Sequence, residues 1–157
     1  MVRVLPCRGA DLLERPDRMN RVEPCLCIAD RNPNVSVYLG RVFLERGYKT
    51  RVARNCLEVW RMFREPEAPD LLIFDLEIPC MDSVGTLARL MGRLPELPVV
   101  LYAHGSEGLD HPMIQGAAAL VRKSPDTRAL VRTVDHLINR AYPGRFAEFG
   151  LEEEQLH

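Results

Sequence analysis

Short apolar runs alternate with longer segments of helical periodicity along most of the chain. The first run, residues 25–29, contains only apolar residues and ends at Asp30. A short apolar run that is bounded by polar or turn-forming residues is typical of a buried β-strand. Four further runs follow, the first of them more mixed in composition, so the sequence predicts five strands. The later runs are residues 50–53, 71–74, 98–102 and 118–122.

Helical segments separate the predicted strands. In each one, apolar residues recur three, four, seven or eight positions apart, which places them on one side of an α-helix. The first helix ends at Gly47, and Pro66 and Pro69 end the second. Asp126 is the expected cap of the last helix, and only a short helix is predicted near Pro112. The apolar helix positions are Val35, Leu39, Val42 and Phe43; Val59, Trp60 and Phe63; Val84, Leu87, Leu90 and Met91; and Leu130, Val134, Leu137, Ile138 and Ala141.

Repeated alternation of strand and helix predicts an α/β fold. Right-handed crossovers between parallel strands place helices on both faces of the sheet. The fully apolar runs at 25–29, 71–74 and 98–102 belong in the centre, and the mixed run at 50–53 belongs at an edge. This arrangement is the flavodoxin-like, doubly wound five-stranded parallel sheet of order 2-1-3-4-5.

The length and composition suit one globular domain. The chain has 157 residues, of which 46% are apolar and 27% are charged, and such a chain forms one hydrophobic core. The strand and helix pattern occupies residues 22–142. We expect residues 1–21 to be an N-terminal extension and residues 143–157 to be a C-terminal tail without a DNA-binding module.

Charge and hydropathy exclude several classes of partner. The chain has 21 basic and 22 acidic residues and a formal net charge of −1, which gives no electrostatic basis for binding nucleic acid or acidic membranes. No apolar run approaches the roughly 18 residues that a membrane span needs. Residues 1–20 lack the apolar centre of a secretory signal. We therefore expect a cytoplasmic protein that binds neither nucleic acid nor membranes.

The five cysteines show no metal-binding pattern. Cys25 and Cys27 form a CxC pair inside a predicted strand, and the sequence has no CxxC pair. A metal site there would need additional Cys or His ligands that the local sequence does not supply. We expect all five to be reduced and most to act as small apolar residues. The other three are Cys7, Cys56 and Cys80.

Three charged residues follow predicted strands at the edge where ligands bind in such sheets. Asp30 and Asp75 end two adjacent central strands, and Lys123 follows the fifth. Paired carboxylates suit a divalent cation such as Mg²⁺, and a metal beside Asp75 would make this aspartate a phosphoryl acceptor. Lys123 offers a positive charge to a phosphate oxygen. Each residue alone is compatible with loop capping or a surface ion pair, but the three together favour a site.

The same residues resemble those of a known family. Residues 71–83, LLIFDLEIPCMDS, resemble the apolar strand, phosphoacceptor aspartate and MPGMDG loop of the receiver domain of two-component response regulators. Residues 116–123 are similar to the stretch that ends in the family's lysine. Residues 26–33 align with the family's first strand and acidic pair. The resemblance spans about residues 22–142.

The resemblance implies a role for each charged residue. Asp75 would be the phosphoacceptor, and Lys123 would contact a phosphoryl oxygen. A weakly held Mg²⁺ would be bound by Asp30, Asp75 and the backbone carbonyl of Glu77. The implied partner is a histidine kinase or another signalling protein, and pairing with a second copy of the chain remains open.

One acid of the family's pair is missing. Counting from Pro33 and Gly47 places Asp30 at the first acid and Arg31 at the second, which normally contacts magnesium. A shift of one residue makes Asp30 the second acid and Ala29 the first, and then Pro33 and Gly47 lose their register. In either alignment, the Arg31 guanidinium has two options. It occupies the place of the metal between the aspartates, or it turns to solvent.

Other family features are also replaced. The expected Ser or Thr after the fourth strand is Ala103 in one alignment and Tyr102 in the other, and neither offers the same short hydroxyl. Leu120 stands where the family has an aromatic residue before the lysine. Pro112 interrupts the segment that would form the fourth helix of the family.

These features lead to two functional hypotheses. The first is an atypical, stand-alone, non-enzymatic receiver that signals through protein–protein contacts, with Asp75 as a weak or vestigial phosphoacceptor. The alternative is a functional, Mg²⁺-dependent phosphoacceptor that relays phosphate from a histidine kinase. A hydrolase or flavin-binding protein on the same sheet lacks support, because the sequence has neither a GxSxG nucleophile motif nor a phosphate-binding loop.

Overall fold

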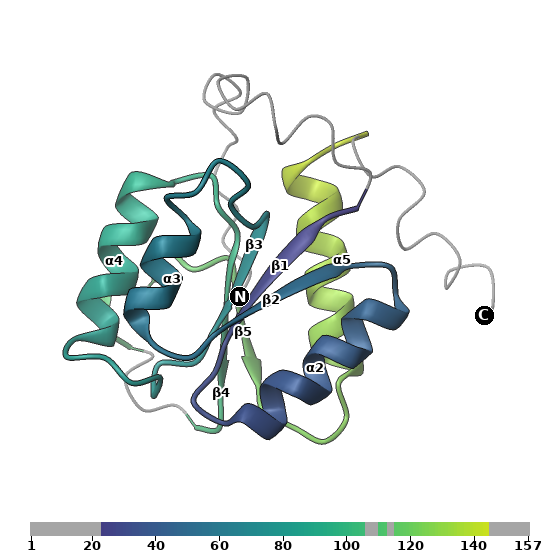
Figure 1. Ribbon diagram of the computed structural model, residues 1–157, viewed down its shortest axis with the longest axis horizontal. Helices are drawn as coiled ribbons and strands as arrows, with labels where there is room; N and C mark the ends of the chain where they lie inside the picture. Colours follow the sequence, from purple (N-terminus) through teal and green to yellow (C-terminus); the bar gives the residue numbers. More distant parts are fainter. Residues whose placement is uncertain (1–22, 106–109, 113–114, 145–157) are drawn as a thin grey trace.

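The computed structural model describes residues 23–105, 110–112 and 115–144. This part forms one sheet of parallel strands with helices on both faces (Figure 1). The expected N-terminal extension, residues 1–21, lies outside the described residues. So does the expected tail, apart from residues 143–144.

Five strands form the sheet within the described residues: β1 (Cys25–Ala29), β2 (Lys49–Ala53), β3 (Leu71–Phe74), β4 (Val99–Ala103) and β5 (Ala119–Arg122). Their order is β2-β1-β3-β4-β5, and every pairing is parallel. This result confirms the doubly wound order predicted from the sequence. β1 and β3 are buried along their whole length, and β2 at the edge is mostly exposed or half-buried. The burial of each strand therefore matches its place in the sheet.

The described part has four α-helices: α2 (Pro33–Glu45), α3 (Cys56–Met62), α4 (Ser83–Arg93) and α5 (Arg128–Ala141). The first three connect successive strands, and α5 follows β5. The caps of α2, α3 and α4 are Asn32, Asn55 and Asp82, whose side chains each accept a backbone N–H of the first turn. The residue before α5 is Thr127, whose side chain makes no capping bond. As predicted, the carboxylate of Asp126 accepts a first-turn N–H, that of Arg128, at 3.0 Å.

The helices divide between the two faces of the sheet. α2 and α5 pack on one face, and α3 and α4 pack on the other (Figure 1). Alternate residues of β1 enter the two cores: Leu26 and Ile28 contribute to the first, and Cys27 and Ala29 to the second. Burial of a large apolar side chain stabilises the fold by about 1.5–3 kcal/mol. These two cores hold the strand ends in fixed relative positions.

The connection between β4 and β5 contains no α-helix in its described residues, 104–105, 110–112 and 115–118. Pro112, near which the sequence predicts a short helix, has a 3₁₀ conformation, and its carbonyl accepts the Gln115 N–H at 3.4 Å. Residues 106–109 and 113–114 of this segment lie outside the described residues. The described positions between β4 and β5 therefore hold a short 3₁₀ turn and no regular α-helix.

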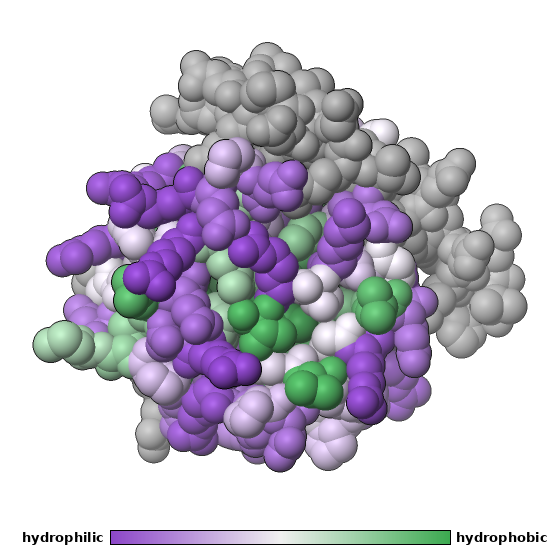
Figure 2. Space-filling model, viewed as in Figure 1, coloured by the Kyte–Doolittle hydropathy of each residue, from purple (hydrophilic) through white to green (hydrophobic). Residues whose placement is uncertain are grey.

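The surface seen in Figure 2 is largely hydrophilic, with small apolar areas separated by polar residues. The described part of the chain has no helix that is both long enough and apolar enough to cross a membrane. Several large apolar side chains are nevertheless exposed on different elements: Val37, Tyr38, Leu44, Val52, Leu57, Met81 and Leu120. Single exposed apolar residues are common on soluble domains and do not by themselves mark an interface.

Candidate functional site

Two buried aspartates lie at the carboxyl ends of neighbouring strands. Asp30 follows β1 and Asp75 follows β3, and the strand register pairs the preceding residues, Ala29 and Phe74. The Asp75 N–H donates to the Ala29 carbonyl at 2.9 Å and extends this pairing to the site. Asp30 is 4% exposed and Asp75 is 2% exposed. Two carboxylates this deeply buried need a compensating positive charge.

Lys123 supplies that charge. It follows β5, and its N–H donates to the Ala103 carbonyl at 2.8 Å. The Nζ atom lies 2.7 Å from Oδ2 of Asp30 and 3.1 Å from Oδ2 of Asp75, and the side chain is only 5% exposed. Burial lowers the pKa of the Lys123 amine. Hydrogen bonds and charges from the two aspartates outweigh this effect, so the pKa lies above its usual value.

Backbone groups fix the orientation of both carboxylates. Oδ1 of Asp30 accepts the Asn32 N–H at 2.8 Å, and Oδ1 of Asp75 accepts the Glu77 N–H at 2.9 Å. The two Oδ2 atoms are therefore the ones that meet at the Lys123 ammonium. Such local bonds after a strand are typical of aspartate in turns. The structure thus brings together the three charged residues that the sequence grouped.

Arg31 turns outward. Of the two orientations that the sequence left open, the structure has the guanidinium paired with Glu77, at 2.8 Å between Nη2 and Oε2. Both side chains are about half exposed, at 50% and 56%. Lys123, not Arg31, is therefore the cation that contacts Asp30 and Asp75. The Arg31 side chain therefore does not fill the space beside the aspartates.

Tyr102 does not act as a hydroxyl substitute near Asp75. Its ring is buried in the core with α5, and its hydroxyl donates to the Ser124 carbonyl at 3.5 Å. The Lys123 ammonium lies 5.6 Å from the centre of this ring, within the range of a cation–π contact. The Tyr102 ring therefore stabilises the charged ammonium of Lys123 and does not contact Asp75 through its hydroxyl. Leu120, at the position of the family's aromatic residue, is 55% exposed.

The donor set for a divalent cation is small. Within the described ranges, no group of three or more His, Cys, Asp or Glu side chains is arranged to hold a metal ion. The ligands expected from the sequence are two carboxylates, Asp30 and Asp75, and the backbone carbonyl of Glu77. Mg²⁺ keeps several waters and commonly uses only one or two protein carboxylates. The residues present therefore fit Mg²⁺ with an incomplete acidic set.

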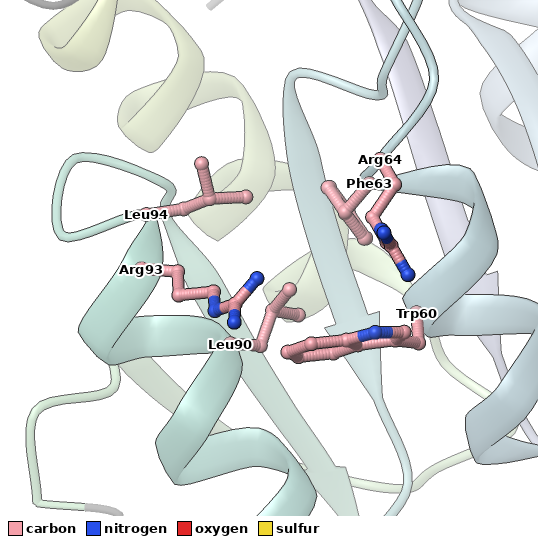
Figure 3. Close-up of a pocket in the computed structure, with 6 residues that line it drawn as sticks. All are labelled: Trp60, Phe63, Arg64, Leu90, Arg93 and Leu94. Carbon is pink, nitrogen blue, oxygen red and sulfur yellow. The ribbon is translucent and has the colours of Figure 1, made fainter.

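A separate cavity of about 420 Å³ lies between α3 and α4 (Figure 3). The Arg93 guanidinium carbon lies 5.3 Å from the centre of the Trp60 ring, a cation–π contact between the two helices. The lining residues are Trp60, Phe63, Arg64, Leu90, Arg93 and Leu94. None of these residues contributes to the charged site at the strand ends.

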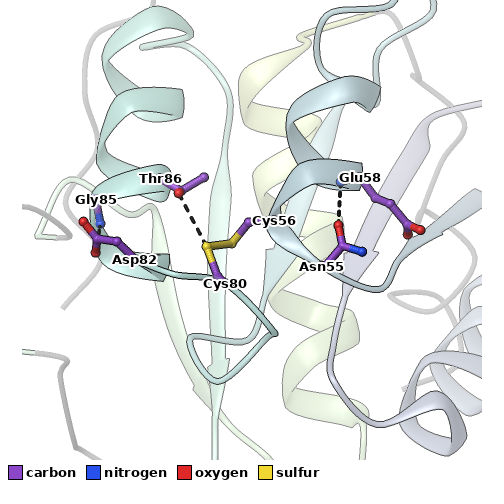
Figure 4. The surroundings of a disulfide bond; sticks show 7 residues. All are labelled: Asn55, Cys56, Glu58, Cys80, Asp82, Gly85 and Thr86. Atoms are coloured by element: carbon purple, nitrogen blue, oxygen red, sulfur yellow. Dashed lines mark hydrogen bonds between the residues drawn. A yellow bond between two sulfur atoms is a disulfide. The ribbon is translucent and has the colours of Figure 1, made fainter.

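Two of the cysteines differ from the expectation. Cys56 and Cys80 form a disulfide with a Cα–Cα distance of 5.4 Å (Figure 4), so the expectation of five reduced cysteines is wrong for this pair. The physical reason is that the loop after β3 folds onto the start of α3. The pair is 24 residues apart, so spacing alone does not reveal it. The available signal was that both cysteines follow strands whose next helices pack on the same face. Cys27 remains a buried thiol, and Cys7 lies outside the described residues.

Comparisons with known proteins agree with this geometry. A family model for the response regulator receiver domain matches residues 26–135. A 65-residue segment is 34% identical to sporulation initiation phosphotransferase F of Bacillus subtilis and covers 41% of this chain and 52% of that protein. A 109-residue segment is 32% identical to protein-glutamate methylesterase/protein-glutamine glutaminase 2 of Rhodopseudomonas palustris and covers 67% and 30%. The chain therefore spans about half of the first relative and under a third of the second.

Solved structures show the same fold. The response regulator TrrA of Thermotoga maritima, crystallised in complex with Mg²⁺-BeF, has a TM-score of 0.67 and 23% identity, covering 73% of this chain and 98% of that one. A CheY-like receiver domain protein from Methanospirillum hungatei has a TM-score of 0.68 and 16% identity, covering 76% and 96%. The family model spans the sheet and the charged site, and the chain therefore belongs to the response regulator receiver domain family.

Proposed function

We propose that this receiver signals through protein–protein contacts and that Asp75 is a slow phosphoacceptor within it. The observation that carries the proposal is the contact of one buried ammonium, Lys123, with both Asp30 and Asp75. A lysine in this place neutralises the charge that a phosphoryl group adds beside two carboxylates. The proposed receiver unit is residues 22–142, with segments 1–21 and 143–157 flanking it.

The transfer step follows from the position of Asp75. One carboxylate oxygen attacks the phosphorus of a phosphohistidine, a P–O bond forms, the P–N bond breaks, and the released imidazole takes up a proton from water. The Glu77 N–H, 2.9 Å from Oδ1, keeps the carboxylate oriented during the attack. The Lys123 ammonium leaves the Asp75 carboxylate oxygen and binds a phosphoryl oxygen. Its long, flexible side chain allows this movement.

Asp30, Asp75 and the Glu77 carbonyl would hold Mg²⁺. When bound, the ion supplies charge neutralisation at the transferring phosphoryl group. TrrA, a protein of the same fold, was crystallised with Mg²⁺-BeF. Arg31 takes the place of one acid of the family's pair, so this chain offers the ion one carboxylate fewer. We therefore propose weak metal binding and slow phosphorylation.

The proposed partner is a histidine kinase or another signalling protein, in the cytoplasm. In this chain, Ala103, Tyr102 and Leu120 replace the hydroxyl and aromatic residues through which the family couples phosphorylation to a conformational change. A partner therefore has to recognise phosphorylated Asp75 in another way. Direct contact of the partner with the surface at the carboxyl ends of the strands, around Asp75, is one such way. Homodimer formation stays a prediction.

Efficient relay of phosphate is a second candidate function. The outward orientation of Arg31 favours it, because the guanidinium is paired with Glu77 and does not block the aspartates. A relative that matches over 65 residues is named a phosphotransferase. Relay requires the receiver to gain and lose the phosphoryl group rapidly. Signalling by a slow phosphoacceptor does not require rapid transfer.

Intact mass after incubation with Mg²⁺ and acetyl phosphate tests both functions. Slow addition of one phosphoryl group that requires Mg²⁺ and is lost in Asp75→Asn supports the first. Addition as fast as in a receiver with both acids, measured side by side, favours relay. If the wild-type chain gains no phosphoryl group from either acetyl phosphate or a phosphorylated histidine kinase, Asp75 is not a phosphoacceptor.

A further inference from the structure

A disulfide lies beside the loop that carries the phosphoacceptor. Cys56 is the first residue of α3, and Cys80 lies in the β3–α4 loop, five residues after Asp75 (Figure 4). Two residues later, Asp82 caps α4 by accepting the Gly85 N–H at 2.9 Å. The crosslink therefore joins the start of α3 to the segment that connects Asp75 with α4.

Contacts that do not form the S–S bond hold the two cysteines near each other. The Cys56 N–H donates to the Pro79 carbonyl at 3.2 Å. Cys80 Sγ lies 3.5 Å from Oγ1 of Thr86 in the first turn of α4. The Cα–Cα distance of 5.4 Å lies inside the range of about 4.4–6.8 Å that disulfides require. The Cys56–Pro79 backbone bond thus ties the two segments together in addition to the S–S bond.

The two cysteine residues differ in exposure. Cys56 is buried at 6% exposure, and Cys80 is half-buried between two exposed residues, Pro79 and Met81. A small thiol or disulfide from solution reaches Cys80 first. Cys27 is fully buried and does not compete with it. Exchange of this kind depends on access to one sulfur of the pair, which Cys80 provides.

The crosslink acts on the backbone that orients Asp75. The Glu77 N–H binds Oδ1 of Asp75, and the Ile78 N–H donates to the Asp75 carbonyl at 3.1 Å. Glu77 also forms the ion pair with Arg31. This backbone has to adjust when a phosphoryl group enters and Lys123 moves to it. A covalent link at Cys80 restricts that adjustment.

We propose that Cys56 and Cys80 form a reversible thiol–disulfide switch that sets the rate of Asp75 phosphorylation, with the disulfide as the slower form. The effect on rate rests on the proposed function of Asp75, whereas the switch itself is a property of the two cysteines. Disulfides that open and close in a reducing compartment are commonly regulatory.

The oxidant is a low-molecular-weight disulfide, RSSR. The Cys80 thiolate attacks one sulfur of RSSR, an S–S bond to Cys80 forms, and one RS⁻ leaves. The Cys56 thiolate then attacks the Cys80 sulfur and releases the second RS⁻. Two protein thiols lose two electrons, RSSR gains them, and the two protons end on two RSH molecules. An excess of thiol reverses both steps.

The experiment equilibrates the full chain in reduced and oxidised glutathione at the ratio found inside cells and at more oxidising ratios. Alkylation under denaturing conditions followed by mass spectrometry counts the thiols. Hydrogen exchange over residues 76–86 and the phosphorylation rate are measured on the same samples. Cys80→Ser and Cys56→Ser remove the switch, and Cys7→Ser is the matched control that removes a cysteine outside the pair.

We expect two thiols to disappear on oxidation in the wild type and in Cys7→Ser, with slower hydrogen exchange and several-fold slower phosphorylation. In Cys80→Ser and Cys56→Ser, the phosphorylation rate should not respond to the glutathione ratio. A disulfide that stays closed at the reducing ratio overturns the switch, as does equal phosphorylation of both forms. If neither form is phosphorylated, the proposed function fails. In that case hydrogen exchange still tests the switch. If the two thiols are lost reversibly but hydrogen exchange over residues 76–86 does not change, the proposed switch is overturned.

Discussion

Arg31 and Glu77 form an ion pair at the exposed rim of the site, with 2.8 Å between Nη2 and Oε2. Both side chains are about half exposed, so we expect a contribution to stability of no more than about 1 kcal/mol. The main effect of the ion pair is on the position of the Arg31 side chain. It keeps the guanidinium away from Asp30 and Asp75, and among the residues that the structure describes Lys123 is the cation in contact with both carboxylates.

Replacement of Arg31 by aspartate should strengthen the proposed metal site. Arg31→Asp adds a carboxylate beside Asp30 and removes the partner of Glu77. We expect Mg²⁺ to bind roughly tenfold more tightly, which corresponds to about 1.4 kcal/mol of binding free energy, and phosphorylation of Asp75 to become faster. Calorimetric titration with Mg²⁺ and intact mass over time measure the two effects.

Arg31→Gln is the matched control because it removes the guanidinium without adding an acid. If the added carboxylate is responsible, the glutamine variant should bind Mg²⁺ about as weakly as the wild type. A gain of equal size in both variants would show that the arginine itself repels the ion. No gain in Arg31→Asp would contradict the proposed role of this position.

Loss of Lys123 should destabilise the fold at neutral pH. Lys123→Met keeps most of the side-chain volume but leaves two buried carboxylates without their cation. We expect the free energy of unfolding to fall by about 3 kcal/mol, as for other buried pairs that lose one partner. Urea denaturation measures the change, and added Mg²⁺ should recover part of it.

The pH dependence of this contribution follows from the raised pKa of Lys123. A raised pKa means that the folded state favours the charged amine. The stabilisation is therefore present throughout neutral pH and is lost only as the pH rises through the pKa in the folded protein. Arg122→Met, at the neighbouring exposed position, is the control and should change stability little.

Much of the fold could be predicted because hydrophobic burial determines it directly. The strand order followed from apolar runs such as residues 71–74, which are buried along their whole length. The grouping of Asp30, Asp75 and Lys123 followed from the rule that the carboxyl ends of parallel strands meet at one edge of the sheet.

The orientation of Arg31 and the pairing of Cys56 with Cys80 could not be predicted. Arg31 has a long flexible side chain with acids on both sides, and the choice of Glu77 depends on loop geometry. The disulfide depends on how the β3–α4 loop lies against α3, which no periodicity encodes.

The hydroxyl of Tyr48 links the end of α2 to α5. It donates to Oδ1 of Asp135, whose Oδ2 accepts from Nη2 of Arg46 at 2.7 Å. We expect Tyr48→Phe to lower the free energy of unfolding by about 1 kcal/mol through loss of this bond. Asp135→Ala should cost about 3 kcal/mol because it removes the partly buried acceptor for both groups. Thr133→Ala, exposed on the same helix, is the control, and equal effects of all three would contradict this assignment in denaturant titrations.

The thiol of Cys27 should resist alkylation. Burial raises the pKa of this thiol to about 12, with a smaller contribution from Cys25. In the native protein, iodoacetamide should leave Cys27 unmodified at pH 8, and it should react only after denaturation. Because the folded pKa exceeds the unfolded value of 9.0, stability should also decline as the pH rises from about 9 to about 12. Rapid native alkylation at pH 8 would show that the core around β1 opens.

Trp60 is the single tryptophan of the chain and should report on the contact between α3 and α4. The guanidinium carbon of Arg93 lies 5.3 Å from the centre of the Trp60 ring. Arg93→Ala uncovers the ring, and we expect its fluorescence to shift to longer wavelength, with a loss of about 0.5–1 kcal/mol from the cation–π contact. Arg93→Met loses the same charge but keeps an apolar cover, so its emission should stay close to that of the wild type. Unchanged emission in Arg93→Ala would show that the arginine does not cover Trp60 in solution, because no other tryptophan contributes to the signal.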